Sequence, residues 1–144
     1  MINDDTIKLL KECNAGVKTA VTSIDEVLPH TEDKKLKSLL TTSKGVHEKI
    51  GNTTHELLND YHDNEKDPNP MVKAMSWMKI NMKLAVDSSD NEVADLIFDG
   101  CNMGVKSLYR YLNQYQNADE KTKALTRDLI QEEENLRKEL SAYL

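Results

Sequence analysis

The stretch CNAGVK at residues 13–18 recurs almost unchanged as CNMGVK at residues 101–106, 88 positions later. Five of the six letters agree, and each copy is followed at nearly the same distance by a turn and a second long amphipathic segment. The turns are PHTED (29–33) and NADEK (117–121), and both contain a Thr or Asp that can cap a following helix. We interpret the repeat as a duplicated helical hairpin.

Apolar residues recur at spacings of three and four through the long segments of both halves, as in helices that bury one face. The first hairpin is predicted over about 4–63. Pro29 should end its first helix, and Thr31 is the expected cap of the second.

A connection of about 64–89 follows, and its amphipathic part at 71–86 predicts a short helix roughly 24 Å long. Ser89 and Glu92 form a Ser-x-x-Glu capping box, which predicts the start of a second hairpin over about 90–143. Two hairpins joined in this way predict a single all-α domain over 1–144, a four-helix bundle with a long crossover.

The composition agrees with this fold and excludes several classes of function. A charged fraction of 31% and an apolar fraction of 38% suit long amphipathic helices, and five glycines with three prolines are few for a β-rich fold. The net charge of −6 argues against nucleic acid as a partner. The acidic N-terminus, the absence of a long apolar run and the low cysteine count predict a cytoplasmic protein without a membrane span.

Cys101 with Gly104 forms a box near the start of a predicted helix, and Trp77 lies in the predicted crossover helix. In these features the chain resembles a family of small bacterial ferritin-like proteins of unknown function, and the resemblance covers nearly the whole chain. It implies the ferritin-like fold and a role in metal handling or stress protection.

The di-iron motif of ferritin-like enzymes is missing from this sequence. Such proteins place a Glu-x-x-His pair on each of two helices. Here the residues three positions before the four histidines are Val27, Lys44, Asn52 and Asn59. This departure argues against ferroxidase or oxygenase chemistry, and against an enzyme.

Counting outward from the two turns places one polar residue of each helix at a common level. These residues are Asn14, His47, Asn102 and either Glu132 or Glu133. They could bind a single transition metal ion (iron, manganese or zinc) through His47 and the glutamate. They could equally form a hydrogen-bonded layer that fixes helix register. Because Asn is a poor ligand for iron or zinc, we favour the layer and expect no cofactor.

The repeated motif also carries a glycine and a cysteine. Gly16 and Gly104 predict a close approach of the first and third long helices, since glycine inside a helix costs about 1 kcal/mol relative to alanine. We expect Cys13 and Cys101 to be buried, reduced and poorly reactive. A redox protein that uses these two thiols is the weakest alternative.

Two further groups are candidates for contacts outside the chain. The crossover segment carries a candidate interaction surface made of Met71, Met75, Trp77, Met78 and Met82. It favours internal packing or a homodimer, with another protein as the remaining option. His55 and His62 lie in a polar row that is either a surface metal site or a solvated helix face.

The sequence therefore favours a non-catalytic ferritin-like bundle that acts through protein–protein contacts or self-assembly. The alternative is a metal-binding ferritin-like protein that uses His47 and Glu132 or Glu133.

Overall fold

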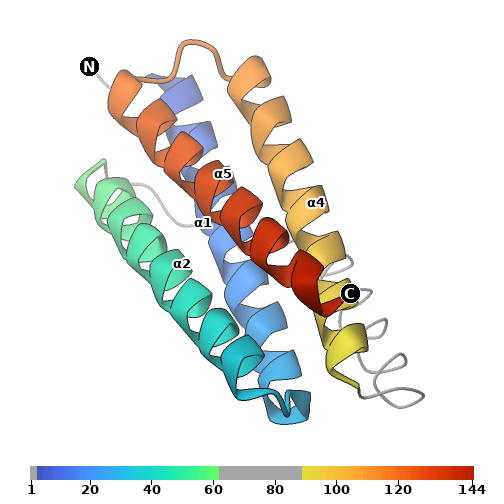
Figure 1. The fold of residues 1–144 in the computed structure, drawn as a ribbon. Coiled ribbons are helices and arrows are strands. Elements are labelled where there is room, and N and C mark those ends of the chain that lie inside the picture. Colours follow the sequence, from blue (N-terminus) through green and yellow to red (C-terminus); the bar gives the residue numbers. More distant parts are fainter. Residues whose placement is uncertain (1–2, 62–88) are drawn as a thin grey trace.

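The computed structural model describes residues 3–61 and 89–144, and all regular secondary structure in that part of the chain is helical. Four long helices pack against one another: α1 (Asp4–Val27), α2 (Lys34–Asp60), α4 (Asp90–Gln114) and α5 (Glu120–Leu140). Figure 1 shows α1 with α2 and α4 with α5 as two antiparallel hairpins. Short 3₁₀ turns follow α1 (η1, Leu28–His30) and α5 (η2, Ser141–Tyr143). The predicted crossover helix, with Met71, Met75, Trp77, Met78 and Met82, lies outside the described residues, and so does His62.

Each of these four helices begins at a residue whose side-chain oxygen accepts a hydrogen bond from the backbone N–H three positions later. The four N-cap residues are Asn3, Asp33, Ser89 and Asp119. The predicted start of α4 after Ser89 is confirmed. The predicted cap at Thr31 is wrong, because η1 prolongs α1 and the Thr31 hydroxyl donates back to the Val27 carbonyl over 2.9 Å.

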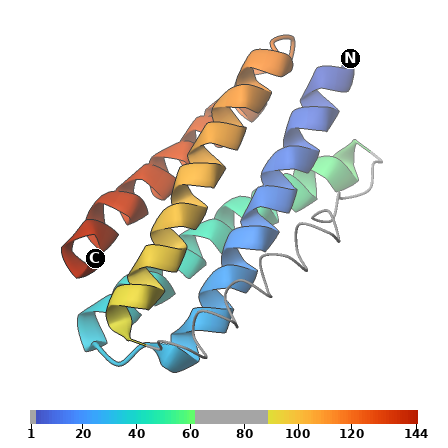
Figure 2. The ribbon, with the colours of Figure 1, turned by 90° about the vertical axis from the view of Figure 1, so that its right-hand side faces the viewer.

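The two hairpins meet along two further helix pairs. α1 packs against α4 and α2 packs against α5, while α1 also contacts α5 across the centre. Figure 2, a view turned by 90°, shows that α2 ends at one end of the bundle and that α4 begins at the other.

At both ends of the bundle, a carboxylate of one hairpin accepts hydrogen bonds from backbone N–H groups in the turn of the other hairpin. At one end, the Asp90 carboxylate on α4 accepts from the backbone N–H groups of Glu32 and Asp33, over 2.8 and 2.9 Å. At the other end, Asp5 on α1 accepts from the Asn117 N–H over 3.0 Å. In each case a carboxylate in the first helical turn of one hairpin accepts from the connecting turn of the other.

The interior contains apolar clusters at several levels, interrupted by buried polar side chains. One cluster joins the two hairpins near η1 and includes Ile24, Leu36, Leu40, Ile97 and Leu140. Leu9, Val17, Val105 and Leu129 belong to a second cluster further along the bundle. Burying each such side chain contributes about 1.5–3 kcal/mol, so these clusters hold the helices together.

Within the described ranges, none of the helices has both the length and the apolarity of a membrane span.

Candidate functional site

The centre of the bundle contains a histidine that is held at both ring nitrogens. His47 on α2 is fully buried, and its Nδ1 lies 2.8 Å from the Ser43 carbonyl oxygen. Its Nε2 lies 2.8 Å from Oε1 of Glu133 on α5. Because a carbonyl can only accept, Nδ1 carries a hydrogen, and the Nε2–Glu133 contact then shares one further proton.

The surroundings of His47 decide where that proton resides. Burial is the largest influence and lowers the pKa of His47, but the hydrogen bonds and negative charges around the ring outweigh it. These are chiefly the hydrogen bond and charge of Glu133, with the Ser43 carbonyl and the Glu132 charge adding to them, so the pKa of His47 is raised. The raised pKa favours the form in which a buried imidazolium faces the Glu133 carboxylate.

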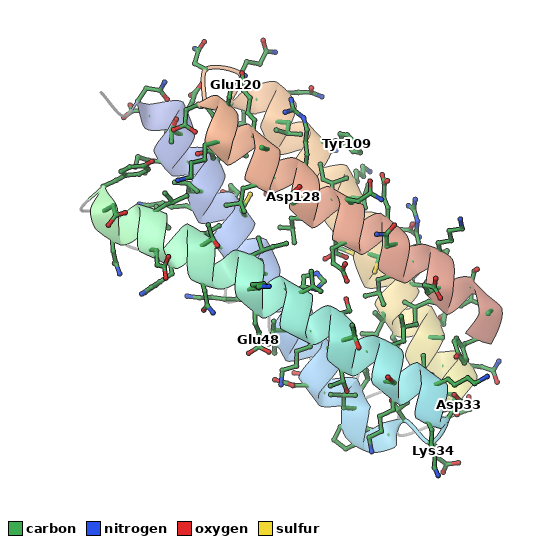
Figure 3. All side chains as sticks on the ribbon, turned by 60° about the vertical axis from the view of Figure 1, so that its left-hand side comes forward. Asp33, Lys34, Glu48, Tyr109, Glu120 and Asp128 are labelled. Atoms are coloured by element: carbon green, nitrogen blue, oxygen red, sulfur yellow. The ribbon has the colours of Figure 1, made fainter. Side chains whose placement is uncertain are left out.

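His47 and Glu133 occupy equivalent positions of the two hairpins. His47 lies 14 residues after the N-cap Asp33, and Glu133 lies 14 residues after the N-cap Asp119. Because α2 and α5 pack against each other, residues at this shared position meet across the centre. Figure 3 looks onto these two helices, where the labelled Glu48 marks the residue next to His47 on the outer side of α2.

Helix α4 completes the surroundings of the Glu133 carboxylate. The Cys101 thiol hydrogen-bonds to Glu133, and burial together with this negative charge raises the pKa of the thiol. One turn later, a Cβ atom at Gly104 would lie 3.4 Å from the Glu133 carboxylate carbon. The missing side chain at residue 104 therefore leaves room for the carboxylate.

Glu132 lies at the rim of this centre, half-buried between α2 and α5. The buried Ser43 hydroxyl donates to Glu132 Oε1 over 2.8 Å and lies 3.4 Å from His47 Nδ1. A serine nucleophile needs a neighbouring ring nitrogen that can take its proton. Nδ1 already carries a hydrogen, so Ser43 and His47 do not form a nucleophile–base pair in this state.

Of the predicted four-residue layer, the structure brings His47 together with the two glutamates and places both asparagines elsewhere. Asn14 is buried, but its Oδ1 accepts from Thr54 Oγ1 over 2.8 Å. Thr54 lies seven residues beyond His47, about 10 Å along α2. Asn102 is exposed, and its Oδ1 accepts from Arg137 over 2.9 Å.

The two asparagines lie away from His47 for different physical reasons. Helical side chains lean toward the N-terminus of their own helix, and η1 lengthens the first turn. Counting residues outward from the turn therefore pairs Asn14 with His47, whereas its actual partner Thr54 lies about two turns further along α2. In the second hairpin the level is nearly right, but neighbouring helical residues point in directions about 100° apart. Cys101 faces the centre, and Asn102 consequently faces outward.

The two thiols are buried, as predicted, but they lie in different surroundings. Cys13 belongs to the second apolar cluster and lies 3.2 Å from the Thr126 hydroxyl, whereas Cys101 belongs to the first cluster beside Glu133. Burial is the main reason that the pKa of Cys13 is raised to about 11. Both thiols therefore stay protonated at neutral pH, and their low reactivity remains a prediction.

The role predicted for Gly16 is wrong, because this residue is exposed and no atom lies within 4 Å of a Cβ built there. The close approach of α1 to α2 occurs instead at Gly51, where a Cβ would lie 2.8 Å from Val17 Cγ1. The repeated motif does not include Gly51. Only its position four residues after His47, on the same face of α2, could have indicated it.

The polar row that contains His55 does not form a metal site in the part of the chain that is described. His55 is exposed, and its Nε2 lies 3.1 Å from Asn59 Nδ2. Throughout residues 3–61 and 89–144, no group of three or more His, Cys, Asp or Glu side chains is arranged to hold a metal ion.

Sequence reasoning missed Ser43 and the contact of Cys101 with Glu133 at the centre, and it missed Thr54 two turns further along α2. Ser43 lies one turn before His47 and Thr54 two turns after it, so their spacing along α2 is the signal that could have found them.

Comparisons with protein families, with curated proteins and with solved structures find no match to this chain.

Proposed function

We propose that this chain is a ferritin-like bundle in which a structural ion pair occupies the position of a metal centre, and that it acts through contacts of its outer surface with other protein molecules. The order of the helices supports the ferritin-like part of the proposal. Two hairpins pack together, and α2 ends at the opposite end of the bundle from the start of α4.

The observation that carries the proposal is the use of both nitrogens of His47. A metal ligand must offer a free lone pair, and metal binding releases the proton that occupies it. Here Nδ1 donates to a carbonyl and Nε2 shares a proton with Glu133, each over 2.8 Å. A metal ion at His47 would therefore have to break the ion pair that closes the centre.

A buried ion pair of this kind specifies structure more than it adds stability, because desolvation offsets much of the attraction between the charges. At the same position of the two similar hairpins, α2 carries the basic His47 and α5 carries the acidic Glu133. At this level each helix therefore has the other as its partner. The pair therefore favours one register of α2 against α5, as a buried polar residue does in a coiled coil.

The proposal is tested by measuring the metal content of protein purified without chelator, together with its mass in solution. We expect far less than one metal ion per chain, and a mass above that of the monomer or a co-purifying protein. One tightly held ion per chain, lost in Glu133→Gln and kept in the exposed control Glu48→Gln, would contradict it.

A second candidate function, metal binding, is favoured by one observation. Glu133 contacts both His47 and Cys101, which are side-chain types of transition-metal sites. In residues 3–61 and 89–144 they are not arranged to hold an ion, so binding would have to rearrange them. Binding would displace the proton of the His47–Glu133 pair and the proton of the Cys101 thiol, so it should strengthen as pH rises. Zinc titrations at two pH values, with Cys101→Ser as the variant, separate this candidate from the first.

A further inference from the structure

We propose that the bundle binds a buried water molecule between α1, α2 and α5, held by the side-chain amide of Asn14. The inference goes beyond the proposed role in protein contacts and does not depend on it. The site lies in the half of the interior between the His47–Glu133 pair and the end of the bundle at which α1 and α5 begin (Figure 1).

This half of the interior is polar at positions where the other half is apolar. Three buried threonines correspond to three buried leucines of the other half, because they lie 3, 7 and 21 residues after the N-caps of α2 and α5. The pairs, with the threonine first, are Thr122 with Leu36, Thr126 with Leu40, and Thr54 with Leu140. The leucines all belong to the first apolar cluster. Burying a hydroxyl instead costs free energy unless it is hydrogen-bonded, so this half needs partners for its polar groups.

The described part of the chain does not supply all of these partners. Only 2% of Asn14 is exposed, and its Nδ2 has no hydrogen-bond partner within residues 3–61 and 89–144. Within the same ranges, the buried hydroxyl of Thr122 also has none, and it lies one turn before Thr126 on α5. Buried polar atoms in proteins are nearly always paired with protein or with ordered water. The site therefore needs a further hydrogen-bonding group at Asn14.

The need at Asn14 does not depend on which way its amide is turned. Thr54 Oγ1 lies 2.8 Å from both Asn14 Oδ1 and the Gly51 carbonyl oxygen, and its single hydrogen can be donated to only one of them. With the amide turned over, Nδ2 would donate to Thr54 and Oδ1 would take the unpaired place. In both orientations one atom of the amide lacks a partner among the described residues.

The chemistry of this level favours water over an ion. Cys13, next to Asn14 on α1, lies 3.2 Å from the Thr126 hydroxyl, so the polar groups here are an amide, a thiol and the hydroxyls of Thr54 and Thr126. All of them are neutral at pH 7, since burial raises the pKa of Cys13 to about 11. Water can donate and accept, and proteins hold roughly one buried water per 27 residues, typically bonded to about three otherwise unpaired groups.

The experiment is NMR spectroscopy of the ¹⁵N-labelled full chain, which detects transfer of magnetisation from water to the side-chain amide of Asn14. We expect a cross-peak whose sign in the rotating frame is that of a dipolar contact, because this sign distinguishes a bound water molecule from exchange of the amide hydrogens. Thr54→Val removes a hydroxyl that could relay the signal, and the cross-peak should persist in this variant.

A second measurement, ¹⁷O relaxation dispersion, counts the long-lived water molecules in the protein. Asn14→Leu should hold at least one fewer than the wild type. The matched control is Asn102→Leu, at the equivalent but exposed position of the repeat, and it should hold the same number as the wild type.

Three results would overturn the site. The first is a wild-type Asn14 amide with cross-peaks only to other hydrogens of the protein, and the second is loss of the water cross-peak in Thr54→Val. The third is an equal number of long-lived water molecules in Asn14→Leu and the wild type. If Asn14→Leu does not fold, the spectra of the wild type and Thr54→Val decide the question alone.

Discussion

At the scale of single residues, the centre of this protein depends on one proton shared between His47 and Glu133. The contact joins two buried groups over 2.8 Å, and the Ser43 carbonyl and the negative charge of Glu132 also favour the charged form of His47. Removing one member of a buried ion pair strands the charge of the other, which costs about 3–5 kcal/mol. The pair is therefore the position where a small chemical change should have the largest effect.

The stability of the protein should depend on pH through His47. The pKa of His47 is raised above its ordinary value of 6.5, so the folded state holds its proton more tightly than the unfolded state. This contribution is complete below pH 6.5 and is lost as pH rises through the raised pKa. Urea unfolding of the wild type and His47→Gln across this range should show a difference in unfolding free energy that shrinks as pH rises. A difference that is constant or grows would contradict the assignment.

Glu133→Gln should destabilise the protein by about 3 kcal/mol near neutral pH, because it leaves the imidazolium without its counter-charge. Glu48→Gln is the control, because it removes an exposed carboxylate from the outer side of α2. It should change the free energy of unfolding by less than about 0.5 kcal/mol. Denaturant unfolding of both variants makes the comparison. Equal effects at residues 48 and 133 would refute a special role for the buried pair.

Asn14 and Asn102 should act independently, because one bonds to Thr54 inside the bundle and the other to Arg137 at the surface. The unfolding free energies of Asn14→Leu and Asn102→Leu should therefore add in the double variant. Asn14→Leu and Thr54→Val should instead cost less together than the sum of the two, since Thr54 donates to Asn14. Additivity in the second double variant would mean that this hydrogen bond contributes little.

At the scale of helices, local chemistry accounts for where each element begins. The Ser89 box and the turn around Asp119 could be read from the sequence, because a cap depends on neighbouring residues alone. The failure at Thr31 also has a local cause, since the 3₁₀ turn after α1 moves the cap to Asp33. The contacts of Asn14 and Gly51 could not be predicted by counting, because they depend on how α1 and α2 are shifted along each other.

Two glycines of α2 should respond in opposite ways to alanine. Gly45 has open space around it, so Gly45→Ala should stabilise the protein by about 0.5–1 kcal/mol through helix propensity. At Gly51 the new Cβ would lie 2.8 Å from Val17 Cγ1, so Gly51→Ala should destabilise the protein, by up to about 2 kcal/mol. Thermal unfolding of the two variants measures both effects. Stabilisation by Gly51→Ala would show that α1 and α2 are not held so close together.

At the scale of the whole molecule, the repeated motif indicated the architecture but not the chemistry. Each hairpin holds the connecting turn of the other through hydrogen bonds, as at Asp90 and Asp5. The centre differs between the halves, because equivalent positions carry His47 and Glu133. Counting outward from the two turns pointed to His47 and to either Glu132 or Glu133. It could not show that Cys101, rather than Asn102, faces them.

The most direct test of this account is thermal unfolding of the wild type and His47→Ala, each with a chelator and with added iron, zinc or manganese. If the His47–Glu133 pair is structural, the wild type should unfold at the same temperature under all these conditions. His47→Ala should then unfold at a lower temperature, by the same amount with and without metal, because Glu133 is left buried without its partner. A metal-dependent rise in the unfolding temperature of the wild type that disappears in His47→Ala would contradict the account.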